Sequence, residues 1–219
     1  MKLEGAIVNF LGDSITQGVG ASSPEHVYPR IIEKRFGLKK ANNYGISGTR
    51  FARQTKPSDE PSFDLDFCSR VEGMDPEADA VVVFGGTNDF GHGDAPLGTP
   101  ADRTKDTFWG ACHELMRSLV EKYPGKPVVI CTPLHRITED VPTGDNKPEP
   151  VAVLDEYIEI IRTVARYYAL PILDLNAVSG IQPRVPAIQE ALCPDGLHPN
   201  DAGQEILAKC VSNFLLYNV

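Results

Sequence analysis

Short apolar runs recur along the first 175 residues, and each run is closed by glycine, proline or polar residues. Runs of this length, rich in β-branched residues, are typical of strands that are buried on both faces of a sheet. The pattern predicts five strands, at residues 6–11, 41–45, 79–85, 126–132 and 170–175.

Between these runs the apolar positions take the three- and four-residue spacing of amphipathic helices. Helices are predicted at residues 24–36, 62–73, 104–123, 150–168 and 201–218. The alternation of strands and helices predicts a parallel sheet with helices on both faces, because crossover connections are right-handed. Such sheets bind ligands at the carboxyl ends of their strands, so the loops after the strands are the place to search for chemistry.

The chain of 219 residues is long enough for one sizeable core, and its composition indicates no linker or second domain, so a single domain over residues 1–219 is predicted. A net charge of −9 would repel nucleic acid and anionic lipid surfaces. Neither nucleic acid nor a membrane is therefore expected as a partner. The sequence does not predict the oligomeric state. No apolar stretch is long enough to span a bilayer, and the first residues lack a full signal peptide, which favours a cytoplasmic protein.

The five cysteines are an odd number and contain no CxxC pair. Neither a disulfide framework nor a structural zinc site is therefore indicated, and free thiols are expected. No metal and no cofactor is predicted.

Four polar blocks stand at the ends of predicted strands or just before the last helix: "GDS" at 12–14, "YGISGTR" at 44–50, "GGTND" at 85–89 and "DGLHPND" at 195–201. In the last block, the spacing Asp195-x-x-His198 lets a carboxylate accept a hydrogen bond from the imidazole of the same loop. Ser14 would supply a nucleophile. Alternatively, Ser14 could be only a helix N-cap, and Asp195 and His198 could cap the final helix, although Asp201 is better placed for that.

These four blocks, in this order over residues 12–198, resemble the GDSL family of esterases and lipases within the SGNH hydrolase superfamily. The signature reads "GDSI", with Ile15 in place of leucine, which is a volume-conserving change. The resemblance implies a three-layer α/β/α fold of flavodoxin-like type with a five-stranded parallel sheet. It also implies a carboxylic ester hydrolase.

The resemblance further implies the role of five residues. Ser14 would attack the ester carbonyl, His198 would take and return the proton, and Asp195 would hold the imidazole. The oxyanion hole would consist of the backbone N–H groups of Ser14 and Gly48 and the side-chain amide of Asn88.

Other polar residues near these blocks have less defined roles. Asp13 and Asp89 are expected to accept local backbone hydrogen bonds. Asp13, Arg50 and His92 could also contact the substrate. His92 is predicted to lie in a long loop rich in glycine and proline, of a kind that often borders an active site, and His135 could reach the rim of the site.

Two alternatives from other classes stay open. A metal-dependent hydrolase could be built on Asp13, Asp89, His92, Asp195 and His198, since carboxylates and imidazoles bind divalent cations. A ligand-binding module without catalysis could use the same sheet, although "GDSITQGVG" is only loosely a phosphate-binding loop.

The substrate depends on loops at residues 91–103, 134–150 and 176–192, which are expected to shape the site. An acyl ester, a thioester or an acetylated sugar would present the same carbonyl to a serine, so lipase, lysophospholipase and thioesterase activities are alternatives. The first two loops contain few large apolar residues. This composition favours short acyl groups, above all acetyl groups on carbohydrates, over long-chain lipids.

Overall fold

The centre of the molecule is a sheet of five parallel strands. The computed structural model describes residues 1–142 and 152–219. The strands are β1 (Ile7–Gly12), β2 (Lys40–Gly45), β3 (Ala80–Phe84), β4 (Val128–Cys131) and β5 (Ile172–Leu173). Their order is β2-β1-β3-β4-β5 and every neighbouring pair is parallel, so all five predicted strands are confirmed.

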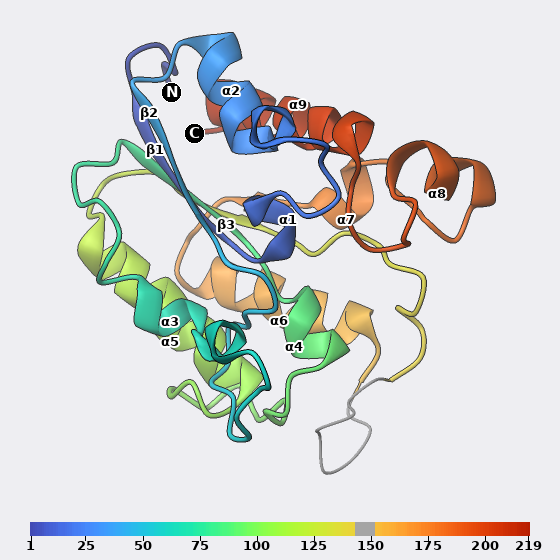
Figure 1. Ribbon diagram of the computed structural model, residues 1–219. Coiled ribbons are helices and arrows are strands. Elements are labelled where there is room, and N and C mark those ends of the chain that lie inside the picture. The colour runs from blue at the N-terminus through green and yellow to red at the C-terminus, as the bar shows by residue number, and fades with distance from the viewer. Residues whose placement is uncertain (143–151) are drawn as a thin grey trace.

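Helices cover both faces of this sheet (Figure 1). Helices α2 (Tyr28–Phe36) and α9 (Asp201–Tyr217) lie on one face, and α3 (Phe67–Arg70), α5 (Phe108–Lys122) and α6 (Leu154–Tyr167) lie on the other. The remaining helices are short: α1 (Ser14–Gln17), α4 (Thr87–Gly91), α7 (Leu175–Val178) and α8 (Pro186–Leu192). The three-layer α/β/α architecture implied by the resemblance is therefore confirmed.

Alternate residues of the central strands point to opposite faces of the sheet. Val8 and Phe10 of β1 pack with α2 and α9, whereas Leu11 of β1 and Val81 and Val83 of β3 pack with α3, α5 and α6. All five side chains are fully buried. Burial on both faces explains why β3 is a continuous apolar run rather than an alternating one, and why the one polar side chain within β1, Asn9, is itself buried.

Two predicted helices are interrupted. Segment 24–36 consists of the 3-10 helix η1 (Pro24–His26) followed by α2, and segment 62–73 consists of the 3-10 helix η2 (Pro61–Asp64) followed by α3. Pro29 lies in the first turn of α2, where a residue without an N–H group is tolerated but cannot continue an earlier helix. The prediction of one continuous helix is wrong in both segments.

Two long helices begin at other caps than the sequence suggests. Thr107 caps α5, because its Oγ1 accepts from the Gly110 N–H at 3.1 Å, so the helix does not start at residue 104. Asn200, not Asp201, caps α9 by accepting from the Gly203 N–H at 3.1 Å. Helix α6 begins at Leu154, and the first two residues predicted for this helix lie outside the described residues.

Candidate active site

Ser14 opens the short helix α1 immediately after β1. The cap of this helix is Asp13, whose Oδ1 accepts a hydrogen bond from the Ile15 N–H at 3.0 Å. Because Asp13 caps the helix terminus, the Ser14 hydroxyl is not used for capping. The interpretation of Ser14 as only a helix cap is therefore wrong.

Asp195 and His198 lie in the loop before α9 and bond to each other. His198 Nδ1 is 2.6 Å from Asp195 Oδ2, and Asp195 Oδ1 accepts from the N–H groups of Leu197 and His198 at 2.8 and 2.7 Å. Partial burial acts to raise the pKa of Asp195, but these N–H groups and the imidazole outweigh it, so the pKa lies below its usual value. The carboxylate is ionised at neutral pH and fixes the orientation of the His198 ring.

The other ring nitrogen of His198 reaches Ser14. Nε2 lies 3.0 Å from the Ser14 Oγ, although the two residues are 184 positions apart in the sequence. The Ser14 residue is 7% exposed and the His198 side chain 17%, whereas the Asp195 side chain is 54% exposed. Hydroxyl, imidazole and carboxylate thus form one hydrogen-bonded row, the arrangement that lets a base activate a hydroxyl nucleophile.

The turn after β2 carries Gly48, which has a φ of +72°. A Cβ at this position would come within 2.5 Å of the Phe63 ring, so both the backbone conformation and the available space require glycine. The Ile46 N–H donates to the Gly12 carbonyl at 3.1 Å and ties this turn to the end of β1. Gly48 and Ser14 consequently follow neighbouring strand ends.

Asn88 lies in α4, after β3, and its side chain reaches the same turn. Its Nδ2 donates to the Thr49 carbonyl at 3.0 Å, directly beside Gly48. Its Oδ1 is 3.0 Å from His92 Nε2. Asn88 is buried, and its Nδ2 has a second hydrogen that bonds to none of the residues the structure describes. The structure thus brings together all five residues that the resemblance singled out.

Arg70, from α3, links the ends of β1 and β2 and the turn after β2, a role that the sequence did not indicate. Its guanidinium donates to the carbonyls of Gly12 and Tyr44 and to Oγ1 of Thr49, at 2.7 to 3.3 Å. It also stacks on the Phe67 ring, 4.4 Å from its centroid. Burial lowers the pKa of Arg70 to about 10, so it stays charged at neutral pH. In the sequence, Arg70 is one polar position of a predicted helix, and no local pattern singles it out.

Asp13 and Asp89 are buried carboxylates beneath the strand ends. Asp89 accepts from the backbone N–H groups of Phe51 and Ala52, both at 2.9 Å. Burial raises the pKa of Asp13 to about 7, although a backbone hydrogen bond and the charge of Arg70 act against this rise. The local backbone hydrogen bond that the sequence predicts is present at Asp13. Asp89 instead accepts from N–H groups 37 and 38 positions away, because the turn after β2 packs against α4.

Arg50 and His92, the other two candidates for substrate contact, bond to each other. Arg50 Nη2 is 2.5 Å from His92 Nδ1, and Arg50 Nη1 donates to the Phe63 carbonyl at 3.1 Å. His92 does not lie in a loop, as the sequence predicts, but at the carboxyl end of α4, where its N–H donates to the Asn88 carbonyl at 3.0 Å. One helical turn therefore separates Asn88 and His92, so their side chains share a face.

The sequence matches the GDSL-like Lipase/Acylhydrolase family over residues 10–206. The chain belongs to this family. Among solved structures, one chain is 30% identical, with 99% of this chain and 98% of that chain covered and a TM-score of 0.82. A Lactobacillus plantarum protein is 26% identical, with 99% of both chains covered and a TM-score of 0.81.

A more distant structural neighbour of this GDSL-like acylhydrolase is a two-domain esterase active on acetylated mannans. It is 23% identical, with a TM-score of 0.62, and 97% of this chain and 48% of that chain are covered. No curated protein matches the chain. Family membership makes the protein a carboxylic ester hydrolase, which acts on small ester substrates.

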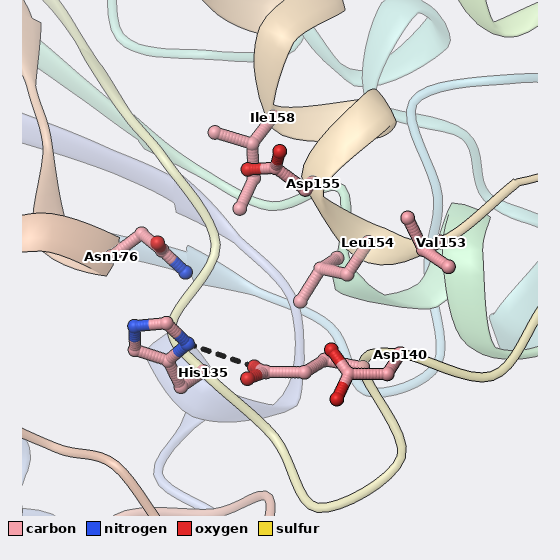
Figure 2. Close-up of a pocket in the computed structure, with 8 residues that line it drawn as sticks. His135, Asp140, Val153, Leu154, Asp155, Ile158 and Asn176 are labelled. Atoms are coloured by element: carbon pink, nitrogen blue, oxygen red, sulfur yellow. Dashed lines mark hydrogen bonds and ion pairs between the residues drawn. The ribbon is translucent and has the colours of Figure 1, made fainter.

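The acylhydrolase also has a pocket of about 400 Å³ beside the loop that follows β4 (Figure 2). His135 lines it and its Nδ1 lies 2.8 Å from Glu139 Oε2, while Asn176 of α7 forms another part of the wall. The same loop contacts the segment that carries Asp195, because the Ile137 N–H donates to the Gly196 carbonyl at 3.1 Å. The loop after β4 thus contributes to the pocket and also contacts the segment that carries Asp195, but the described lining of the pocket includes none of Ser14, Asp195 and His198.

Three further observations concern metals, thiols and membranes. Within residues 1–142 and 152–219, no group of three or more His, Cys, Asp or Glu side chains could hold a metal ion. All five cysteines of the acylhydrolase are free thiols. Within the same ranges, no helix has the length and apolar character that crossing a bilayer requires.

Proposed function

We propose that this acylhydrolase is a serine esterase in which Ser14 is the nucleophile, His198 the general base and Asp195 the residue that orients the base. The observation that carries the proposal is the pair of hydrogen bonds from Ser14 Oγ to His198 Nε2, 3.0 Å, and from His198 Nδ1 to Asp195 Oδ2, 2.6 Å. A hydroxyl is a poor nucleophile until a base within this distance removes its proton.

The reaction proceeds in two halves. His198 Nε2 takes the hydroxyl proton while Ser14 Oγ bonds to the carbonyl carbon, and it then gives the proton to the leaving alcohol, which leaves an acyl-serine. A water molecule repeats the sequence, with His198 as base, and releases the carboxylic acid and the free hydroxyl. Asp195 stays ionised throughout and stabilises the imidazolium that forms in each half.

The negative charge that develops on the carbonyl oxygen requires donors that are fixed before the reaction. We assign this role to the backbone N–H groups of Ser14 and Gly48 and to Nδ2 of Asn88. In support, neither backbone N–H donates to another residue within the described ranges, and Asn88 Nδ2 uses only one of its hydrogens, toward the Thr49 carbonyl.

The substrate that fits this site is a short acyl ester, above all an acetyl group on a carbohydrate. The loop after β4 offers two well-exposed large apolar side chains within its described part, Ile137 and Val141, whereas contact with a lipid surface requires an extended apolar patch. Residues 143–150 of the loop predicted to shape the site lie outside the described residues.

The loop after α4 is polar and firmly held. Asp94 is buried and accepts from the N–H groups of Thr55 and Lys56 at 2.7 to 3.1 Å, so this segment is anchored to the turn region rather than free to move as a lid. A lipase usually needs a movable lid at its interface. The two-domain esterase active on acetylated mannans, which is similar in fold over 48% of its chain, supports an acetylated sugar as the substrate.

The test is a panel of p-nitrophenyl esters from acetate to palmitate, together with acetate release from acetylated xylo- and manno-oligosaccharides. We expect kcat/KM to be highest for acetate and acetate to be released from at least one sugar. A kcat/KM that rises toward palmitate, with no acetate released from any sugar, would favour a lipase. Faster cleavage of acyl thioesters than of acyl esters would favour a thioesterase.

The same panel, repeated after treatment with EDTA, also tests the two alternative classes of protein, a metal-dependent hydrolase and a ligand-binding module. Activity that is lost on treatment with EDTA and restored by a divalent cation would favour a metal-dependent hydrolase. Absence of hydrolysis with every ester and thioester would favour a ligand-binding module and contradict the proposal.

A further inference from the structure

We propose that His92 is a positioning residue that orients the Asn88 amide toward the substrate, and that Arg50 in turn fixes the protonation state of His92. The inference rests on the proposed function, in which Asn88 donates to the carbonyl oxygen. It assigns to Arg50 and His92 a role other than the substrate contact that the sequence suggested.

The direction of the hydrogen bonds follows from the chemistry of the groups. A guanidinium has donors only, so His92 Nδ1, 2.5 Å from Arg50 Nη2, is the acceptor of that bond. An imidazole whose Nδ1 accepts carries its proton on Nε2, and this nitrogen lies 3.0 Å from the amide of Asn88.

The protonated Nε2 of His92 selects one of the two orientations of the Asn88 amide. The Asn88 Oδ1 has to face His92, because an NH₂ group there would meet the Nε2–H, donor against donor. Nδ2 then faces the Thr49 carbonyl, 3.0 Å away, and directs its second hydrogen to the crevice beside Gly48. A bond accepted at Oδ1 also polarises the amide and strengthens the Nδ2–H as a donor.

The hydrogen bonds that connect Arg50, His92 and Asn88 begin at the Arg50 guanidinium, a buried cation whose position is fixed by its neighbours. Arg50 is 3% exposed, and its Nη1 donates to the Phe63 carbonyl and lies 3.7 Å from the Asp64 carboxylate. Burial lowers the pKa of Arg50, and the charges of neighbouring carboxylates oppose this shift. Because a guanidinium loses its proton only at very high pH, Arg50 is a donor at any pH at which the enzyme works.

The same geometry argues against His92 as a substrate ligand. Both of its ring nitrogens already have partners, Arg50 at Nδ1 and Asn88 at Nε2. A residue that acts through Asn88 changes kcat, because the donor matters most in the transition state, whereas a residue that binds the substrate changes KM.

The test compares two substitutions of His92. His92→Gln retains a donor for Asn88 and an acceptor for Arg50 in one amide, whereas His92→Phe retains the ring shape and removes both. We expect His92→Phe to lower kcat by about 10- to 100-fold with KM within about threefold, since misplacing one oxyanion donor costs no more than the 10²–10³ of deleting it. We expect His92→Gln to retain most of the parent kcat.

A double substitution separates a loss of kcat that acts through Asn88 from a loss caused by disruption of the surrounding structure. Asn88→Ala removes the amide that His92 orients. Adding His92→Phe to Asn88→Ala should therefore lower kcat further by less than about threefold. A full additional loss in this background would overturn the inference, and so would a rise in KM with unchanged kcat in His92→Phe alone. Thermal melting of each variant confirms that it is folded.

A spectroscopic measurement tests the inference without any activity. In protein labelled with ¹⁵N-histidine, the His92 ring should be neutral with its proton on Nε2, and His92→Gln serves to assign the signal. A proton on Nδ1 would overturn the inference even if the parent hydrolyses esters well. Conversely, absence of ester hydrolysis would contradict the proposed function while this measurement still decides the orientation of His92.

Discussion

The two sides of the candidate site are built in different ways. The proton-transfer side, Ser14, His198 and Asp195, depends on one loop whose carboxylate is half exposed and held by two N–H groups of the same loop. The donor side, Gly48 and Asn88, lies among charged residues of which Arg50 and Asp89 are buried and Arg70 is half-buried. These three supporting residues all bond to the backbone of segments around the donor side.

This difference separates activity from stability. The half-exposed Asp195 carboxylate contributes little to the folded state, so its loss should reduce catalysis and leave the free energy of unfolding almost unchanged. Buried groups with several hydrogen bonds are part of the core, so changes on the donor side should reduce both. Four substitutions test this distinction.

Asp195→Asn should have the largest effect on activity. Asparagine can still accept from the Leu197 and His198 N–H groups, but its NH₂ group would face His198 Nδ1 and leave the proton on Nε2, toward Ser14. We expect kcat to fall by about 10³–10⁴ and the melting temperature to stay within about 2 °C. Steady-state kinetics measures kcat and thermal melting measures the melting temperature, and Asp59→Asn, at an exposed aspartate, is the control. A kcat of Asp195→Asn within threefold of the parent would contradict the role of Asp195.

Asn88→Ala should lower kcat by about 10²–10³, with a smaller change in KM, because one oxyanion donor is removed. It should also lower the melting temperature, since the Thr49 carbonyl and His92 each lose a buried partner. The exposed Asn213→Ala, on α9, is the matched control. Unchanged kcat would remove Asn88 from the proposed oxyanion hole.

Arg70→Met should mainly affect stability. The change removes donors from the Gly12 and Tyr44 carbonyls and from Thr49 Oγ1, and we expect the free energy of unfolding to fall by about 3 kcal/mol. Urea denaturation measures this loss, and Arg117→Met, at an exposed ion pair of α5, should change the same quantity by less than about 1 kcal/mol. Equal effects of the two substitutions would mean that the hydrogen bonds of Arg70 do not stabilise the donor side.

Asp13→Asn should have the smallest effect on activity, and its effect on stability depends on pH. Burial raises the pKa of Asp13 from 3.8 to about 7, so between these values the carboxyl is protonated in the folded chain and ionised in the unfolded one. The parent therefore loses stability from this group as pH rises from about 4 to about 7. The melting temperature of Asp13→Asn relative to the parent should rise over this range and then level off; a constant difference would contradict the shifted pKa.

Much of the fold was predictable because the strands are local features. Each run of β-branched residues, such as that of β3, identifies a strand without knowledge of its neighbours. The helices α1 and α4 were not predicted, since one turn is too short to show a period. The single domain over residues 1–219 stays a prediction, although helices from both halves of the chain pack on the sheet.

The supporting residues of the site were less predictable than its proposed catalytic residues. His92 was expected in a loop because glycine and proline follow it, yet the Asn88-x-x-x-His92 spacing is a signal for two side chains on one helical turn. The hydrogen bonds of Arg50 and Arg70 join residues 13 to 58 positions apart, such as Arg50 with Phe63 and Arg70 with Gly12. No local pattern encodes contacts at that separation.

The most direct test of the central claim, that Ser14 is an activated nucleophile, is intact-mass spectrometry after treatment with a serine-directed phosphonate. We expect one adduct per chain, located at Ser14 by peptide mapping. Ser14→Ala should form no adduct, and Ser118→Ala, at a serine of α5 outside the site, should form it at the parent rate. Equal labelling of the parent and Ser14→Ala, or no labelling of a parent that hydrolyses esters, would contradict the account.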